Sequence, residues 1–375
     1  MKRPNLDIIL MPTLACNLAC DYCYILEKQS GMISETVLER ALEGVFRHND
    51  PRYPTNIYWH GSEPLLAGID FYRSVCRLIH QRYGDHEVRH HIQTNGILLN
   101  DEWFDFFIEE HITTGVSLDG PKELHDAYRK THDGRGSFDL VFNNIMAARK
   151  KKLYLDALCV ITRRTLGHED ELFNFFYEHK ISFGFEPLIP ENEWMWHELS
   201  ITPEAYARVS ISLFDRWFYQ PERRLDAVMP AYHFAHAIMT GENSYCKFAG
   251  DCANNYITVA PDGQVHSCIM FARDPRLAFG NIAKQTLEEI LASPVRREFL
   301  KERVSSSNGC EKCRWVTLCH AGCPYQAFVQ TGSILERDMF CRSYRLIFDH
   351  VSKTIASELD RVRQGETPFS EAAQH

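Results

Sequence analysis

The order of strand-like and helix-like segments constrains the fold of this chain more than any other feature. Up to about residue 190, short runs rich in β-branched and aromatic residues alternate with longer amphipathic segments. The predicted strands read DIILMP, NIYWHG, VRHHIQTN, TTGVSLD, LDALCVIT and ISFGFEP. Helices are predicted over residues 34–48, 69–83, 101–110, 138–151 and 168–179, with Ser34 and Asp101 as N-caps.

This alternation predicts an α/β fold with a parallel sheet, because parallel strands need crossover connections. Six strand–helix units are too few for a closed eight-stranded barrel, so we expect a partial (β/α)6 barrel of the TIM type. Ligands of open parallel sheets bind at the carboxyl ends of the strands. Functional residues are therefore expected in the loops that follow the predicted strands.

The pattern changes after the sixth predicted strand and indicates further domains. We expect the barrel to occupy residues 1–200, a helical linker 201–240 and a cysteine-rich domain 241–345. Residues 346–375 are predicted to form a C-terminal helix and a polar tail, QGETPFSEAAQH, which is expected to be disordered.

Composition and charge exclude several classes of partner. The chain has 375 residues, 45% of them hydrophobic, and a net charge of -9. Its longest basic run is 149–152, so no nucleic-acid partner is expected. The apolar run 8–11 is too short for a signal peptide or a membrane span. We therefore expect a cytoplasmic protein without a membrane partner.

Thirteen cysteines in a reducing compartment indicate metal ligation or redox chemistry rather than disulfides. Cys16, Cys20 and Cys23 stand in the loop after the first predicted strand. Three thiolates leave one coordination position open. A structural zinc site needs four ligands, whereas an iron–sulfur cubane held by three cysteines exposes one iron. Zinc, or cysteines scattered in the core, is the alternative.

The CxxxCxxC spacing, with Tyr22 before the third cysteine, resembles the signature of the radical S-adenosylmethionine (SAM) superfamily. The resemblance implies that Cys16, Cys20 and Cys23 hold a 4Fe-4S cluster and that SAM binds its open iron, with Tyr22 in the cofactor site. One electron from an external donor such as flavodoxin or ferredoxin then splits SAM and gives a 5'-deoxyadenosyl radical.

Further motifs fit the same resemblance. Gly61, Ser62 and Glu63, in WHGSEPLL, stand where the family's GGEP motif holds the SAM amino group, and Ser62 replaces a glycine. Ser117, in GVSLDGP, and Arg129, in HDAYR, are the candidate partners of the SAM carboxylate. As alternatives, Ser117 is an ordinary strand-end residue and Arg129 a surface arginine.

A second group of eight cysteines follows in the C-terminal third. Eight thiolates make two sets of four, which suit two zinc sites or two iron–sulfur clusters. Their spacing resembles the SPASM domain of radical SAM maturases. The resemblance implies two auxiliary 4Fe-4S clusters, three clusters in all, that accept an electron from the substrate. The first is expected on Cys246, Cys252, Cys268 and Cys323, and the second on Cys310, Cys313, Cys319 and Cys341. Cys76 and Cys159 are predicted to be buried thiols.

The chain resembles two groups of maturases along its length. Anaerobic sulfatase maturases oxidise Cys or Ser to formylglycine, and peptide maturases, including cyclophane-forming ones, install C–C or thioether crosslinks. The sulfatase maturases carry an Asp after the cysteine that aligns with Cys268, where this chain has Ile269. Because isoleucine accepts no proton, His60 and Glu186 are the candidate catalytic bases. The alternatives are a packed histidine and a strand-end salt bridge.

Three readings of the function follow. The favoured one is a radical SAM oxidoreductase that modifies a precursor peptide or protein, and the second is a sulfatase maturase. The third is a non-catalytic iron–sulfur electron carrier. The segment ENEWMWHE, with Trp194 and Trp196, is expected to line the approach of a peptide. No leader-binding domain is expected before the first strand. The histidines at 86, 90 and 91 are predicted to be solvated.

Overall fold

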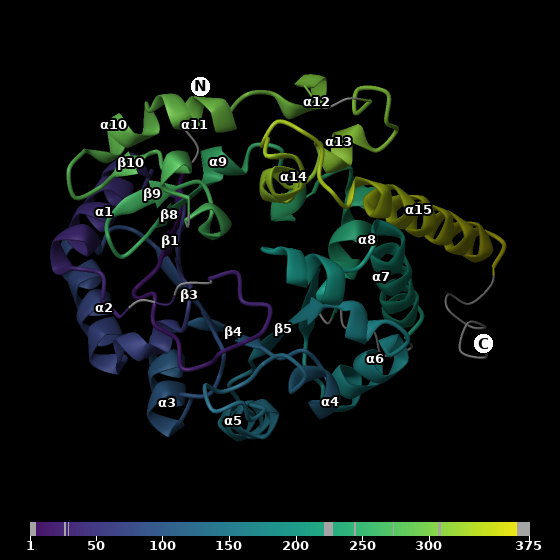
Figure 1. Cartoon of the computed structure of the whole chain (residues 1–375), viewed down its shortest axis with the longest axis horizontal. Coiled ribbons are helices and arrows are strands. Elements are labelled where there is room, and N and C mark those ends of the chain that lie inside the picture. The colour runs from purple at the N-terminus through teal and green to yellow at the C-terminus, as the bar shows by residue number, and fades with distance from the viewer. Residues whose placement is uncertain are drawn as a thin grey trace. The chain divides into compact units, whose positions relative to one another are not determined.

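The chain folds into two compact units. The computed structural model describes residues 5–25, 28, 30–220, 228–243, 245–272, 274–306 and 309–365 (Figure 1). The first unit comprises Met1–Leu118, His125–Asp156 and Asp251–Lys301, and the second comprises Asp119–Leu124, Ala157–Gly250 and Glu302–His375. The tail from residue 366, which was predicted to be disordered, lies outside the described residues.

A mixed sheet forms the centre of the first unit. Its strands are β1 (Asp7–Leu10), β2 (Thr55–Trp59), β3 (Val88–Thr94), β4 (Thr113–Ser117), β8 (Tyr256–Val259), β9 (Gln264–His266) and β10 (Gly280–Asn281). They lie in the order β10-β9-β8-β1-β2-β3-β4. Strands β8 and β1 to β4 run parallel, whereas β9 and β10 pair antiparallel. Strand β8 pairs with the first strand of the chain.

The helices of this unit are α1 (Glu35–His48), α2 (Ile69–Tyr83), α3 (Asp101–Glu109), α5 (Phe138–Lys150), α9 (Cys252–Asn255), α10 (Leu287–Leu291) and α11 (Pro294–Phe299). Four of them, α1, α2, α3 and α5, were predicted, and three short ones, α9 to α11, were not. Ser34 caps α1, as predicted, and accepts from the Val37 N–H. The prediction of Asp101 as a cap is wrong. Asn100 caps α3 by accepting from the Trp103 N–H at 3.1 Å, and Asp101 is the first helical residue.

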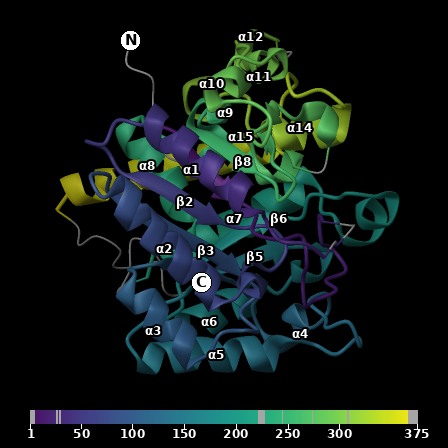
Figure 2. The same ribbon diagram turned by 90° about the vertical axis from the view of Figure 1, so that its left-hand side faces the viewer.

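The two faces of this sheet differ in chemistry. Helices α1, α2 and α3 cover one face (Figures 1 and 2), where Trp59 packs on Tyr72 with ring centroids 5.2 Å apart. Side chains alternate along a strand, so Tyr58 and His91 point to the opposite, helix-free face. There the two rings stack at 4.5 Å, and His91 Nε2 lies 3.2 Å from Asn56 Oδ1. The helix-free face is therefore polar and aromatic.

The histidines at the start of β3 are not all solvated, so that prediction is wrong for His90. It is 8% exposed, and its Nδ1 accepts from Trp59 Nε1 at 3.2 Å. Burial lowers the pKa of His90 to about 4. The reason is register: His90 pairs with Ile57 of β2 and points toward the helices, whereas its neighbour His91 points away.

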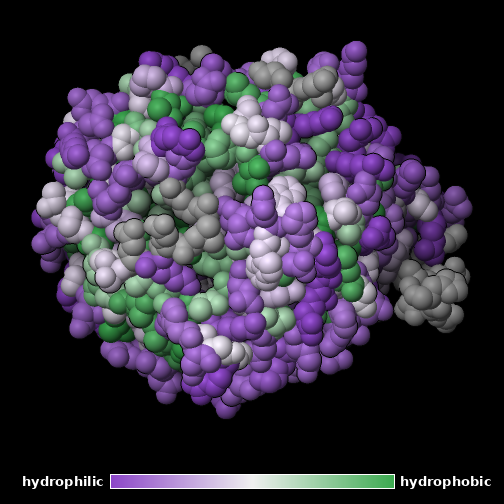
Figure 3. Space-filling model, viewed as in Figure 1, coloured by the Kyte–Doolittle hydropathy of each residue, from purple (hydrophilic) through white to green (hydrophobic). Residues whose placement is uncertain are grey.

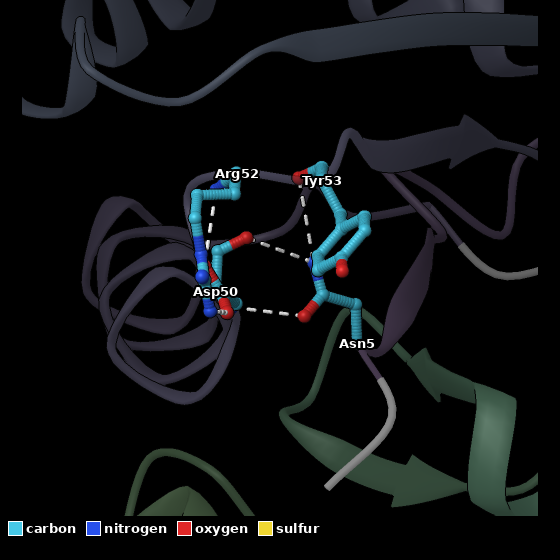
Figure 4. A network of polar contacts seen from close by, with 4 residues as sticks. All are labelled: Asn5, Asp50, Arg52 and Tyr53. Carbon is cyan, nitrogen blue, oxygen red and sulfur yellow. Dashed lines mark hydrogen bonds and ion pairs between the residues drawn. The ribbon is translucent and has the colours of Figure 1, made fainter. Parts of the chain in front are cut away.

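A small polar network fixes the amino-terminal end of β1. Asn5 Nδ2 donates to the Asp50 carbonyl at 3.1 Å and to the Tyr53 carbonyl at 3.4 Å, while its Oδ1 accepts from the Asp50 N–H at 2.9 Å (Figure 4). The turn after α1 is thereby tied to Asn5, two residues before β1. This anchor lies at the opposite end of the strand from the cysteine loop.

The second unit contains a small parallel sheet and most of the C-terminal helices. Strands β5 (Asp156–Ile161), β6 (Phe183–Pro187) and β7 (Val228–Met229) lie in that order. The helices are α4 (Lys122–His125), α6 (Glu169–Glu178), α7 (Pro203–Phe218), α8 (Ala231–Thr240), α12 (Arg303–Ser306), α13 (Val316–Cys319), α14 (Pro324–Thr331) and α15 (Cys341–Arg363). Helix α15 packs on α7 and α8. The predicted α/β class with a parallel sheet is confirmed.

The surface and the helices carry one further observation. Polar side chains cover most of the face in Figure 3. Among the described residues, no helix combines the length and the apolarity that crossing a membrane requires.

The buried His90 makes acid stability a test of the fold. Between pH 6.5 and 4 the unfolded chain binds more protons at this residue than the folded chain, so stability falls as the pH falls. His90→Gln keeps an acceptor for Trp59 without the titration. We expect the wild-type apoprotein to lose about 2 kcal/mol more stability than His90→Gln between pH 7 and 5, in urea unfolding. Equal losses would contradict the burial of this imidazole.

Candidate cofactor-binding and active site

The three clustered cysteines lie in the loop that leaves the carboxyl end of β1. Cys16, Cys20 and Cys23 are each half-buried. Cys16 Sγ accepts from the Leu18 N–H at 3.4 Å and lies 3.8 Å from Asn95 Nδ2. Burial raises the pKa of the Cys16 thiol. Amide donors aimed at a sulfur atom suit a thiolate ligand of an iron–sulfur cluster, whose properties depend on such hydrogen bonds.

The turn after β2 supports this loop from one side. Gly61 has φ +90° and Ser62 φ +43°, both in the left-handed region. A Cβ atom on Gly61 would lie 2.8 Å from Met11 Cε, so a larger residue would displace its neighbour. The left-handed backbone conformation of Ser62 is strained for an L-residue. Its Oγ donates to the Leu14 carbonyl at 2.8 Å. This hydrogen bond offsets part of the cost of a serine where the family motif has a glycine.

Glu63 ties the ends of β2 and β3 together. Its fully buried carboxylate accepts from the Leu65 N–H at 3.0 Å, the Thr94 hydroxyl at 2.7 Å and the Asn95 N–H at 2.7 Å. Burial raises its pKa to about 7, although these donors oppose the shift. Its own N–H donates to the Ala15 carbonyl at 3.0 Å. The side chain positions the turn, and the predicted contact of Glu63 with a ligand stays a prediction.

A segment after α4 supports the loop from the other side. The Ala19 N–H donates to the Lys130 carbonyl at 2.7 Å. Arg129 is 7% exposed, and its guanidinium lies 5.3 Å from the centroid of the Tyr22 ring. The alternative that Arg129 is a surface arginine is therefore wrong. The structure brings these two predicted cofactor residues together.

Ser117 ends β4 on the helix-free face. It is half-buried, and its Oγ accepts from Gln93 Nε2 at 3.3 Å. Its place at the carboxyl end of a parallel strand matches the predicted position of a ligand-binding residue. No contact with a ligand is tested, so the role of Ser117 stays a prediction.

An apolar surface adjoins the Gly61 turn. Ile269 is 6% exposed and forms a cluster with Met11, Ile25 and Ala260. Its Cδ1 would lie 3.3 Å from a Cβ atom on Gly61. Cys23, Tyr24 and Cys268 pack against this cluster. Ile269 itself offers no group that accepts a proton.

The two candidate bases have different surroundings. His60 directly follows β2, and its buried Nδ1 has no hydrogen-bond partner among the described residues. Burial lowers the pKa of His60 to about 4, so its imidazole is neutral at pH 7. Glu186, in the second unit, forms an ion pair with Lys247 and accepts from the Tyr245 hydroxyl. The strand-end salt bridge, the alternative given for Glu186, is what the structure contains.

The Glu186 partners were not found from the sequence. Burial raises the pKa of Glu186, and Lys247 opposes that shift. Burial lowers the pKa of Lys247, but the nearby Glu186 carboxylate raises it, and the pKa of Lys247 lies above its usual value. The pair joins residues 61 positions apart, so no local pattern could indicate it. The only available clue was that Lys247 directly follows an expected cluster ligand.

One complete set of four cysteines converges in the second unit. Cys310, Cys313, Cys319 and Cys341 line one pocket that is partly open to solvent. Four thiolates are the ligand set of an iron–sulfur cluster or of a zinc site. Among the described residues, no three His, Cys, Asp or Glu side chains are gathered closely enough to bind one metal ion.

The other predicted set of four is divided between the units. Cys252 and Cys268 belong to the first unit, and Cys246 and Cys323 belong to the second. The predicted burial of the two remaining cysteines is confirmed, with Cys76 5% and Cys159 0% exposed.

Comparison with protein families covers the first group of cysteines and part of the second. Residues 10–176 match the radical SAM superfamily, and residues 246–314, which include Cys246, Cys252, Cys268, Cys310 and Cys313, match SPASM, an iron–sulfur cluster-binding domain. The chain therefore contains a radical SAM domain and a SPASM domain. These two domains imply iron–sulfur clusters as cofactors, and the chain is a radical SAM enzyme.

Individual relatives refine this assignment. A cysteine-type anaerobic sulfatase-maturating enzyme of Clostridium perfringens is 28% identical over 376 residues, covering 96% of this chain and all of the relative. The solved structure of anSMEcpe with bound AdoMet and a Kp18Cys peptide has a TM-score of 0.86 at 27% identity, covering 96% of this chain and 100% of that one. Streptococcus suis SuiB, bound to its precursor peptide SuiA, shares the fold, with a TM-score of 0.68 at 17% identity over 91% of this chain and 76% of SuiB.

Ser62 provides a test of the turn. Ser62→Ala loses the hydrogen bond to Leu14 and keeps the left-handed backbone, so we expect a loss of about 1 kcal/mol in urea unfolding of the apoprotein. Ser62→Gly loses the same bond but gains about 1 kcal/mol because glycine adopts this conformation freely. It should therefore match the wild type. A glycine variant as unstable as the alanine variant would contradict the strained turn.

Proposed function

We propose that this radical SAM enzyme oxidatively modifies a residue in a ribosomally made peptide, by a C–C or thioether crosslink. The observation that carries the proposal is the apolar cluster at Ile269 beside Gly61. The resemblance to sulfatase maturases places an Asp at this position. Here the side chain is Ile269, which has no carboxylate to accept the proton that formylglycine formation releases, so a different oxidative modification is favoured.

The residues of the first unit have assigned roles in this proposal. Cys16, Cys20 and Cys23 would hold the radical SAM cluster, and Tyr22 and Arg129 would bind SAM with the 61–63 turn and Ser117. When bound, the cluster and SAM supply a radical that abstracts a hydrogen atom. The buried guanidinium of Arg129 offers a positive charge to the SAM carboxylate.

The two auxiliary clusters would make the reaction a two-electron oxidation. They would be held by the eight C-terminal cysteines and accept the second electron. Oxidation of the substrate also releases a proton. Glu186 is already paired with Lys247 and accepts from the Tyr245 hydroxyl. His60, after the end of β2, has a neutral imidazole. Burial makes His60 a weak base, but its Nδ1 has no hydrogen-bond partner among the described residues, and on that geometry we assign it as the acceptor.

Sulfatase maturation is the second candidate function. It is supported by the similarity over nearly the full length to an anaerobic sulfatase-maturating enzyme. That relative's solved counterpart binds a peptide in its AdoMet complex, which supports a peptide as partner here. The absence of a carboxylate at Ile269 argues against it.

Partners and organisation complete the proposal. The substrate would approach past Trp194 and Trp196, whose residues are 49% and 38% exposed. An electron donor such as flavodoxin or ferredoxin would reduce the protein in the cytoplasm. The domain boundaries 1–200, 201–240, 241–345 and 346–375 stay a prediction, as do the three clusters of 4Fe-4S type.

Product analysis tests the choice of substrate. Reconstituted wild-type protein would be given SAM, dithionite and either a Cys-type sulfatase peptide or candidate precursor peptides from neighbouring genes. We expect deoxyadenosine, no aldehyde on the sulfatase peptide, and a precursor that loses two hydrogens by mass spectrometry. Ile269→Asp serves as the matched variant. Aldehyde formation by the wild-type protein would overturn the crosslinking proposal and support sulfatase maturation.

His60 provides a separate test of proton transfer. His60→Gln keeps a polar side chain of similar size but removes the base, so we expect at least a tenfold loss of modified peptide. Deoxyadenosine should still form, because the SAM-binding residues are unchanged. Unchanged product formation in His60→Gln would exclude His60 as the acceptor.

A further inference from the structure

The two neighbours of Cys246 are both bound to the same carboxylate. Cys246 begins a short helical turn, Cys246–Phe248, in the second unit. The Tyr245 hydroxyl donates to Glu186 Oε1, and the Lys247 ammonium contacts Glu186 Oε2. Glu186 stands at the end of β6, 59 and 61 positions earlier in the chain. One residue on a strand thus holds both sides of an expected cluster ligand.

The burial of these groups makes the arrangement specific. The Lys247 side chain is 7% exposed and that of Glu186 is 31% exposed. A buried ammonium needs a paired charge, because an unpaired one loses its hydration without compensation. Glu186 lies opposite Phe183 and Phe185, which point toward α6 and α7. The carboxylate is therefore fixed by a strand whose other face is packed.

Aromatic packing completes the support of the turn. His233 of α8 stacks on Tyr245 with ring centroids 5.1 Å apart and an angle of 13°. Phe248 packs edge-on against Tyr344 of α15 at 4.9 Å, and its carbonyl accepts from His320 Nδ1 at 2.6 Å. Among the described contacts of this turn, the charged one is the ion pair of Lys247 with Glu186.

We propose that Glu186 is a positioning residue that fixes the Cys246 turn for cluster binding, through Tyr245 and Lys247. The inference rests on the proposed role of Cys246 as a ligand of the first auxiliary cluster. Glu186 supplies no proton transfer in this account. Its two oxygen atoms set the direction of the backbone on either side of the cysteine.

Asp338, a second carboxylate in the same unit, accepts hydrogen bonds from the backbone at or next to two other cysteines. Asp338 is 2% exposed, and its Oδ2 accepts from the Cys323 N–H at 2.8 Å. Its Oδ1 accepts from the Phe340 N–H at 2.7 Å, directly before Cys341. Asp338 fixes its cysteines through the backbone, whereas Glu186 works through flanking side chains. This unit therefore uses two acids, the half-buried Glu186 and the buried Asp338, to hold three expected cluster ligands.

Iron content tests the inference without relying on activity. Glu186→Ala, Glu186→Gln and Lys247→Met would be reconstituted anaerobically and compared with the wild type and with Glu178→Gln, an exposed glutamate at the end of α6. We expect each of the three test variants to bind about a third less iron and sulfide, the content of one cluster of three. The electron paramagnetic resonance spectrum should lose one auxiliary signal. The Glu178→Gln control should keep its full iron.

Two further variants separate positioning from general loss of folding. The double variant Glu186→Gln with Lys247→Met removes both charges, so the unpaired buried charge disappears and iron binding should recover in part. Tyr245→Phe removes a single hydrogen bond and should shift the auxiliary spectrum with little loss of iron.

The contrary outcomes are distinct. Full iron and an unchanged spectrum in Glu186→Gln, together with loss of modified peptide, would overturn the inference and make Glu186 a base. A double variant that binds no more iron than the single ones would also contradict it. If fully loaded wild-type protein yields no deoxyadenosine, the proposed function fails, while the comparison of iron contents still tests Glu186.

Discussion

The loop after β1 depends on backbone hydrogen bonds from two directions, and the rest of the candidate site depends on that loop. Glu63 holds it from the β2 side through the Ala15 carbonyl, and Lys130 holds it from the other side through the Ala19 N–H. Parallel strands make this possible because all their carboxyl ends meet at one edge of the sheet. The three cysteines of this short loop are all half-buried and form no disulfide with one another.

Buried charge distinguishes the functional parts of the chain from its core. Glu63 accepts three hydrogen bonds, Arg129 lies over an aromatic ring, and Glu186 pairs with Lys247. Each arrangement meets the requirement that a buried charge be partnered. The cluster around Ile269 contrasts with them because it is apolar. Hydrogen abstraction by a radical does not itself need an acid at this position. The lack of a carboxylate at Ile269 therefore concerns the later loss of a proton, which differs between substrates.

Local and periodic features of the fold could be predicted from the sequence. The six strands and their helices follow from hydrophobic periodicity. The resemblance to SPASM domains implied the set of Cys310, Cys313, Cys319 and Cys341, which line one pocket in the structure. Long-range features could not be predicted. Strand β8 pairs with β1 across most of the chain, and Glu186 meets Lys247 across 61 positions. His90 was misjudged because one residue of register decides which face of a strand it occupies.

We propose that the loop after β1 holds a radical-generating cluster that is separate from the two clusters of the C-terminal cysteines. The most direct test is iron and sulfide analysis of anaerobically reconstituted protein, with deoxyadenosine measured after SAM and dithionite are added. We expect about twelve irons per wild-type chain and about eight in the triple variant Cys16→Ala, Cys20→Ala, Cys23→Ala. Only the wild type should form deoxyadenosine. Zinc in place of iron, or a fully loaded wild-type protein that leaves SAM intact, would contradict it.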